Sequence, residues 1–253
     1  MKKPTVVLKA ENLTLASAVR SELVTDVSLT AAAGESVGLV GESGSGKSLT
    51  LRSILGLLPS GITQTGGSIE REGKCAMVFQ DPIGALDPLY PVVRQLTEVV
   101  YYQQRLSRKA SREKALELLE LLGLPDSLKR KDRFPQQLSG GQCQRVVIGM
   151  ALACEPNILL CDEPTTALDV TVQRQILELL RRLQRERGFA MVFVTHNLAI
   201  ASSMCSRLCV MKQGRIVEQG ETARVLQRPQ HPYTKMLIGS VLPFPEIEGA
   251  AKR

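Results

Sequence analysis

Residues 41–48 read Gly41-Glu42-Ser43-Gly44-Ser45-Gly46-Lys47-Ser48, the full pattern of a phosphate-binding loop. The loop follows the apolar run from Ser36 to Val40, which predicts a buried strand, and leads into a predicted short helix from Ser48 to Leu58. On such a turn the glycines let backbone N–H groups face phosphate oxygens, Lys47 neutralises their charge, and Ser48 offers a hydroxyl to magnesium. The candidate nucleotide ligands are the residues from Gly41 to Ser48 and the next residue, Leu49. By itself the pattern fits kinases, GTPases and many ATPases alike.

The composition is that of a globular protein, because 253 residues with 43% hydrophobic and 23% charged residues can bury one large core or two small ones. A disordered or fibrous chain is excluded. The net charge of +7 would suit nucleic acid, an anionic membrane surface or ATP itself. With no tryptophan and 4% aromatic residues, few side chains could stack on bases, so we expect no nucleic-acid partner.

No apolar run is long enough to span a bilayer, so we expect a cytosolic chain that associates with a membrane only through partners. The six cysteines lack metal-binding spacing. We expect them to be small buried residues in a reducing compartment.

A helical insert is predicted between Asp81 and Leu138. Its clearest helix has Ser111 as the expected N-cap, Gly123 as the stop, and an apolar stripe formed by Ala115, Leu118, Leu119 and Leu122. Basic residues gather at 105–112 and 129–133. Such runs are usually solvated faces, and contact with a membrane is the alternative.

The core resumes with two apolar strands joined by a helix. Asn157 to Cys161 and Ala190 to Val194 read as buried parallel strands, and the helix between them runs from Val170 to Arg187 with Gly188 as its stop. Leu208 to Lys212 and Arg215 to Gln219 predict a closing hairpin.

Polar residues follow these strands at the edge where open α/β sheets bind ligands. Asp162 and Glu163 are costly at the end of a buried strand unless they face a cation and a water, so Asp162 is the candidate magnesium ligand and Glu163 the candidate base. The alternative is an acidic pair that caps the strand. His196 and Gln80 end two further strands at this edge, where His196 could reach a γ-phosphate and Gln80 the metal or the water.

A second glycine loop, Leu138-Ser139-Gly140-Gly141-Gln142, completes a set of motifs that resembles the ATP-binding cassette family. The resemblance covers nearly the whole chain: the phosphate loop, Gln80, this signature loop, Asp162 with Glu163, the loop Ala167-Leu168-Asp169, and His196. It implies ATP hydrolysis with magnesium by two cassettes that pack head to tail. Ser139, Gly140, Gly141 and Gln142 of one cassette, with Asp169, would then complete the nucleotide site of the other.

The implied fold is a single α/β cassette of the P-loop NTPase class, with a small antiparallel β subdomain and an inserted helical subdomain. Residues 1–80 and 143–220 would form a RecA-like core with the antiparallel part, 81–142 the helical subdomain, and 221–253 a C-terminal tail.

The chain lacks the heptads of repair ATPases and the duplication of translation factors, which favours a transporter subunit over a soluble, non-transport cassette ATPase. The tail Arg228-Pro229-Gln230-His231-Pro232-Tyr233-Thr234-Lys235-Met236-Leu237 resembles that of peptide/nickel importers, and Ser60 to Gly67 is similar to nickel-import ATPases. This implies a peripheral protein at the cytoplasmic face of the inner membrane. Its partners would be a second cassette, identical or sister, two membrane-spanning permease subunits and an extracytoplasmic binding protein, with nickel or peptide as cargo.

One departure from the family concerns adenine, which members stack on an aromatic residue shortly before the phosphate loop. No Phe, Tyr or Trp precedes Phe79 here. We therefore expect weaker adenine discrimination, with apolar residues such as Leu15 or Val19 as substitutes. Nothing after Cys209 could ligate an iron–sulfur cluster, so none is expected.

Overall fold

The computed structural model describes residues 5–19, 22–130, 132–166 and 168–240. The strands of this part are β1 (Val6–Ser17), β2 (Val24–Ala32), β3 (Ser36–Val40), β4 (Ile62–Arg71), β5 (Cys75–Val78), β6 (Ile158–Asp162), β7 (Ala190–Thr195), β8 (Arg207–Lys212) and β9 (Arg215–Glu221). The helices are α1 (Lys47–Leu55), α2 (Val92–Gln104), α3 (Arg108–Leu121), α4 (Ser127–Arg130), η1 (Pro135–Gln137), α5 (Gly140–Ala153), α6 (Val170–Arg187), α7 (Leu198–Met204), α8 (Thr222–Gln227) and α9 (Pro232–Gly239).

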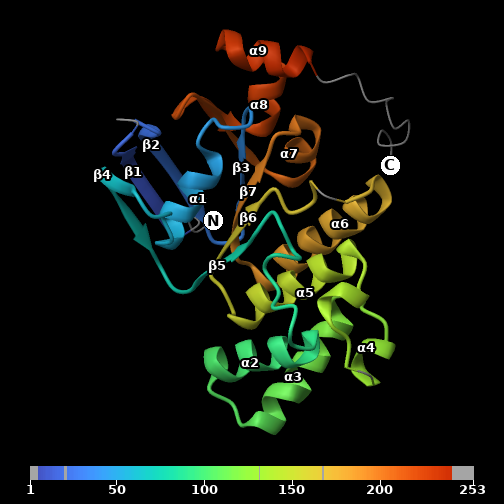
Figure 1. The fold of residues 1–253 in the computed structure, drawn as a ribbon. Coiled ribbons are helices and arrows are strands. Elements are labelled where there is room, and N and C mark those ends of the chain that lie inside the picture. Colours follow the sequence, from blue (N-terminus) through green and yellow to red (C-terminus); the bar gives the residue numbers. More distant parts are fainter. Residues whose placement is uncertain (1–4, 20–21, 131, 167, 241–253) are drawn as a thin grey trace.

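A six-stranded sheet in the order β5-β6-β7-β3-β8-β9 forms the centre of the molecule (Figure 1). Its strands pair in parallel except for β9, which returns antiparallel to β8. Because a parallel sheet is covered on both faces, its strands read as continuous apolar runs. β6 shows this, since all of its residues are buried.

Alternate residues of the sheet strands feed two separate cores. Ile158 and Leu160 face the core shared with α1 and with the antiparallel sheet β2-β1-β4. Leu159 and Cys161 face the core shared with α5, α6 and the helical lobe. Burial raises the pKa of the thiols, to about 12 for Cys205. Four of the six cysteines, Cys143, Cys161, Cys205 and Cys209, are buried as expected, whereas Cys75 and Cys154 are half-buried.

The helical lobe, α2 to α4 with the start of α5, lies at one end of the molecule, and α9 lies at the opposite end (Figure 1). The predicted apolar stripe of α3 is buried as expected. The predicted N-cap was wrong: Ser107 caps α3 by accepting from the N–H of Ala110, whereas Ser111 lies inside the helix and donates its hydroxyl to the Ser107 carbonyl.

Other element boundaries agree closely with the sequence. α6 begins at Val170 and ends at Arg187, both as predicted, and the β8–β9 hairpin lies where the sequence placed it. The first helix is shorter than predicted, because Gly56 adopts a left-handed φ of 83° and terminates α1 after Leu55. The expected division between insert and core after Gln142 falls inside α5.

Candidate functional site

A cavity of about 700 Å³ lies at the carboxyl edge of the parallel strands. Its walls include the loop after β3, together with Gln80 after β5, Glu163 after β6 and His196 after β7. These segments are distant in sequence and meet because parallel strands deliver their carboxyl ends to one edge. The loop residues from Gly41 to Leu49 line it, with the exception of Ser45, which is buried beside Lys47.

The loop can form only with glycine at its first position. A Cβ added to Gly41, whose φ is 154°, would lie 2.1 Å from the carbonyl oxygen of Met211 in β8. At the other end Gly46 has a φ of 104° and is the N-cap of α1. The closing hairpin therefore supports the loop from behind, and backbone N–H groups at the start of α1 are free to point at an anion.

Lys47 is folded back into the loop. Its ammonium donates to the carbonyl oxygens of Gly41 and Glu42, at 2.9 and 2.7 Å. Burial lowers the pKa of Lys47, and the carboxylates of Glu163 and Asp162 oppose that shift. An anion in the cavity would offer this buried cation a better partner than two neutral carbonyls.

Ser48 and Asp162 join the first turn of α1 to the end of β6. The Ser48 hydroxyl donates to Oδ1 of Asp162 at 2.7 Å, and Asp162 is 3% exposed. Burial raises the pKa of Asp162, while the hydrogen bond from Ser48 lowers it. A hydroxyl and a carboxylate so close together are hard oxygen donors, and this pair fits a magnesium ion.

Glu163 is held in an unusual conformation. Its φ is 44°, in the left-handed region that non-glycine residues seldom adopt, and its N–H donates to the carbonyl of Val194 in β7 at 3.0 Å. Its Oε2 accepts from the Thr166 hydroxyl at 2.8 Å and lies 3.0 Å from Nδ1 of His196. The Glu163 side chain is 13% exposed, so it reaches the cavity without being fully solvated.

The signature loop forms the N-terminus of α5. Ser139 and Gln142 make a capping box, in which the Ser139 hydroxyl accepts from the N–H of Gln142 and the Gln142 side chain accepts from the N–H of Ser139. The N–H groups of Gly140 and Gly141 lie in the first turn, where helix N–H groups lack intrahelical acceptors. None of these residues is among the described residues that line the 700 Å³ cavity.

α5 and α6 begin side by side. Asp169 caps α6 by accepting from the N–H of Val172 at 2.9 Å, and the side chain of Val172 packs against Gly141 so closely that a Cβ there would lie 2.4 Å from it. Val172 thus joins the cap of α6 to the signature loop, so Asp169 and this loop form one packed unit. Ala167 lies outside the described residues.

Several residues of the site gave no clear signal in the sequence. Thr166 contacts Glu163, and Leu23 and Leu237 line the cavity. The expectation that Leu15 could contact adenine was wrong, because Leu15 faces the core of the antiparallel sheet and is 0% exposed. Val19, in contrast, is 99% exposed.

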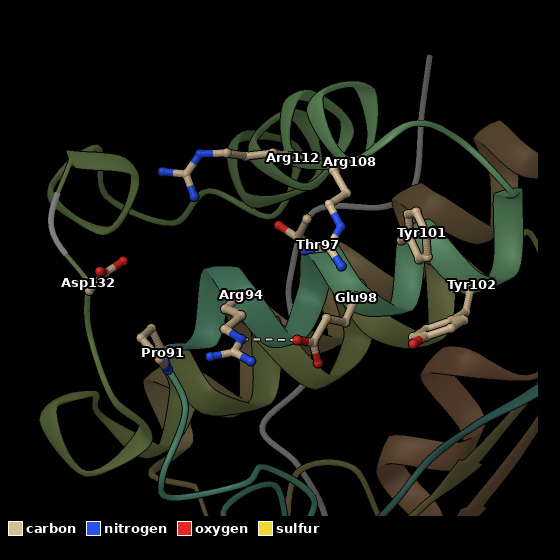
Figure 2. Close-up of a pocket in the computed structure, with 9 residues that line it drawn as sticks. All are labelled: Pro91, Arg94, Thr97, Glu98, Tyr101, Tyr102, Arg108, Arg112 and Asp132. Carbon is tan, nitrogen blue, oxygen red and sulfur yellow. Dashed lines mark hydrogen bonds and ion pairs between the residues drawn. The ribbon is translucent and has the colours of Figure 1, made fainter.

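A second cavity, of about 520 Å³, lies in the helical lobe between α2 and α3 (Figure 2). Tyr101 and Tyr102 stand at one end of it in edge-to-face contact, with ring centroids 5.2 Å apart. Arg108 and Arg112 of α3 lie across from Arg94 of α2. This surface combines exposed aromatic rings with basic groups, a composition typical of protein interfaces.

Comparison with known proteins gives two family matches. Residues 24–166 match the model described as ABC transporter, and residues 217–252 match the model of the oligopeptide/dipeptide transporter C-terminal region. Among the described residues no helix has both the length and the apolar character that crossing a bilayer requires.

Similar proteins include a probable peptide ABC transporter ATP-binding protein, y4tR, of Sinorhizobium fredii, 45% identical over 82% of this chain and 68% of its own length. The oligopeptide transport ATP-binding protein AmiE of Streptococcus pneumoniae is 39% identical over 98% of this chain and 76% of its own length. Among solved structures, the ATP-binding cassette MJ0796, dimeric in a post-hydrolysis state with ADP and Pi, matches with a TM-score of 0.74 and 30% identity over 85% of this chain and 98% of its own. The predicted fold class is confirmed.

Proposed function

The chain belongs to the ABC transporter family, and from that premise we propose that it is the ATP-hydrolysing subunit of an importer of short peptides. As a member of this family it binds and hydrolyses ATP. The observation that carries the cargo class is the match of residues 217–252 to the oligopeptide/dipeptide C-terminal region. The printed names of y4tR and AmiE refer to peptides and oligopeptides, whereas the likeness of Ser60 to Gly67 to nickel-import ATPases points to nickel as the alternative cargo.

In the proposed site the loop from Gly41 to Leu49 binds the phosphates of ATP. Lys47 leaves the carbonyls of Gly41 and Glu42 and bonds a phosphate oxygen. Ser48 and Asp162 would hold magnesium, with Gln80 as a further oxygen ligand beside them. That ion, when bound, neutralises charge on the phosphate oxygens.

Glu163 is the proposed base that polarises the attacking water. The bond from Thr166 and the contact with His196 fix its carboxylate at the cavity wall, and the left-handed backbone at Glu163 aims it there. His196 is the proposed contact for the γ-phosphate, since it lines the cavity at the neighbouring strand end. A fixed carboxylate needs no reorientation at the moment of reaction.

The signature loop is proposed to act on the nucleotide of a second cassette. Ser139 to Gln142 lie outside the cavity of their own chain, and their unit with Asp169 presents the N-terminus of α5. A related cassette is dimeric with ADP and Pi bound. We propose a head-to-tail pair formed with a copy of this chain or with a sister subunit.

The helical lobe is proposed to contact two membrane-spanning permease subunits. Tyr101 and Tyr102 lie there on α2, and Tyr102 is 74% exposed beside the cavity of Figure 2. The chain would then work peripherally at the cytoplasmic face of the inner membrane, with an extracytoplasmic protein delivering the cargo. The alternative of a soluble cassette ATPase leaves the C-terminal region match without a role.

The test is purification of the tagged chain from native membranes, followed by reconstitution of the recovered complex in proteoliposomes with its binding protein. ATP-driven uptake of a labelled dipeptide, absent in a Lys47→Ala complex, is the expected result. Uptake of labelled nickel without peptide uptake would replace the proposed cargo. Recovery of the chain without any membrane subunit would favour the soluble alternative.

A further inference from the structure

The last helix of the described chain reaches the nucleotide cavity. The hydroxyl oxygen of Tyr233, in the first turn of α9, accepts a hydrogen bond from the backbone N–H of Glu42 at 3.0 Å, across 191 positions of sequence. One helical turn later, Leu237 lines the same cavity. Tyr233 is 3% exposed, so this contact is shielded from water.

The N–H group that donates to Tyr233 belongs to the peptide between Gly41 and Glu42. The N–H of Glu42 and the carbonyl of Gly41 belong to the same peptide, and that carbonyl accepts from the Lys47 ammonium at 2.9 Å. The peptide is therefore fixed on both sides, with Lys47 at its oxygen and Tyr233 at its hydrogen. Hydrogen bonds arranged in series polarise and strengthen one another.

The position of Tyr233 is set by groups outside the phosphate loop. The Lys212 ammonium lies 4.8 Å from the centre of the Tyr233 ring. The His231 side chain caps α9 by accepting from the N–H of Tyr233 at 3.1 Å. Glu218 of β9 accepts from the N–H groups of Gln230 and His231, at 2.9 and 3.0 Å, which fixes the turn that precedes the helix.

Burial also keeps the tyrosine in its neutral form, because it raises the pKa of the Tyr233 phenol. The N–H of Glu42, which donates to the phenol oxygen, opposes that rise. When Lys47 turns to a phosphate, the Gly41 carbonyl loses its donor, and the Tyr233 bond is then the one that keeps this peptide from rotating.

We propose that Tyr233 is a positioning residue of the nucleotide site, through which the C-terminal helix α9 holds the phosphate-binding loop in its binding shape. The inference rests on the proposed role of residues 41–48. Because the loop meets the phosphates in the ground state and the transition state alike, its effect falls on the binding of ATP and ADP rather than on the chemical step.

The test compares Tyr233→Phe with Ser240→Ala in the full chain. Tyr233→Phe removes the hydroxyl and keeps the ring over which Lys212 lies, whereas Ser240→Ala removes a hydroxyl that bonds Met236 at the far end of the same helix. Calorimetric titration with ADP and with ATP should show about three- to tenfold weaker binding for Tyr233→Phe, the effect of one hydrogen bond, and no change for Ser240→Ala. The KM for ATP should rise by the same factor with kcat unchanged.

A spectroscopic readout reports on the bond itself. In ¹⁵N-labelled protein without nucleotide, the amide proton of Glu42 should move upfield in Tyr233→Phe and stay in place in Ser240→Ala. A moved Glu42 signal with unchanged ADP affinity would overturn the positioning role, and an unmoved signal would overturn the bond. Lys47→Ala distinguishes a failure of the Tyr233 proposal from a failure of the proposed phosphate loop. If Lys47→Ala loses nucleotide affinity and Tyr233→Phe does not, only the positioning role of Tyr233 is wrong. If Lys47→Ala keeps full nucleotide affinity, the proposed phosphate-binding role of residues 41–48 is wrong as well.

Discussion

The Nδ1 atom of His196 lies 3.0 Å from Oε2 of Glu163, so the ends of the adjacent strands β6 and β7 meet through two side chains at the cavity wall. The Thr166 hydroxyl donates to the same Oε2. One carboxylate oxygen of Glu163 is thus engaged, which leaves the other for a water molecule. A general base needs one oxygen that can accept a proton from water while its side chain is held in position, and this arrangement provides both.

Glu163→Gln should keep nucleotide affinity and lose turnover. Glutamine fills the same volume but cannot accept a proton, and a positioned base is worth about 10²–10⁴ in rate. ATPase assays and calorimetric titration with ATP measure the two effects separately. Glu186→Gln, an exposed change near the end of α6, is the control. Undiminished hydrolysis in Glu163→Gln would remove Glu163 from its proposed role.

Asp162→Asn should stabilise the chain without nucleotide while it weakens magnesium-dependent binding. Burial raises the pKa of Asp162 in the folded state above its unfolded value, so the folded chain resists ionisation of this group. As the pH rises from the unfolded-state pKa through the folded-state pKa, stability is lost, and above that window the loss is constant. The melting temperature of Asp162→Asn should therefore exceed that of the wild type at neutral pH, and the difference should shrink in acid. Equal melting temperatures of the wild type and Asp162→Asn at pH 7 would contradict the conclusion that burying the ionised Asp162 carboxylate destabilises the folded chain.

Gly140→Ala and Gly141→Ala should have different effects. Gly140→Ala tests the proposed contact with a partner cassette, and Gly141→Ala also changes packing within the chain. A Cβ at Gly140 meets only Leu168 at 3.5 Å, an ordinary contact, whereas at Gly141 it would lie 2.4 Å from Val172. Gly140→Ala should therefore keep its melting temperature and lose ATPase activity that requires pairing. Gly141→Ala should lose about 1–3 kcal/mol through overpacking.

The double variant Gly141→Ala/Val172→Ala supplies the control. Removing the Val172 methyl groups makes room for the new Cβ, so stability should return while the activity of the pair stays low. Thermal unfolding and ATPase assays over a range of protein concentrations give both quantities. Activity that returns together with stability would show that Gly141 serves packing alone.

ATP and GTP should be hydrolysed with kcat/KM values within about tenfold of each other. An aromatic platform contributes about 1–3 kcal/mol to binding a base. The chain has no aromatic residue before Phe79 that could stack on adenine. Of the two apolar residues expected to replace it, Leu15 is buried in the core and Val19 is exposed. Competition between the two nucleotides in one assay measures the ratio directly. A preference for ATP of a hundredfold or more would require a base contact that the sequence does not reveal.

The sequence predicted the elements whose ends have local signals. The helical apolar spacing and the stop at Gly188, which adopts a left-handed φ of 69°, predicted the bounds of α6, and the structure adds Asp169 as its N-cap. For α3 two serines four residues apart could each cap a helix, and only the packing of Ser111 into the lobe decides in favour of Ser107. Local signals that compete are resolved by tertiary contacts.

The shared sheet edge of the candidate site could be predicted, and the long-range contacts that support it could not. Glu163, His196 and Gln80 converge because strand ends share an edge, a rule that applies to any parallel sheet. The bond between Glu42 and Tyr233 joins segments 191 positions apart, and no periodicity or spacing encodes such a contact. The antiparallel sheet buries Leu15 for a similar reason, since the register of β1 against its two neighbours decides which of its residues face the core.

Tyr102→Ala should weaken the coupling of ATP hydrolysis to the permease and leave the isolated chain unaffected. The side chain is 74% exposed beside the helical-lobe cavity, where Figure 2 labels it. The helical lobe lies at the opposite end of the molecule from α9, whose Leu237 lines the nucleotide cavity (Figure 1). An exposed aromatic anchor at an interface is worth about 2 kcal/mol or more when it is truncated, whereas its loss from a free surface costs little. In the reconstituted complex, peptide-stimulated ATPase activity should therefore fall severalfold, with basal activity and melting temperature of the isolated chain unchanged. Arg174→Ala, which removes an exposed ion pair with Glu178 on α6, is the control and should leave both activities intact. Within the described residues of the lobe, the aromatic contact of the Tyr102 ring is with the neighbouring Tyr101 ring, so its truncation mainly removes what it would offer to a partner. Full peptide stimulation in the Tyr102→Ala complex would therefore show that the permease contacts another face of the chain.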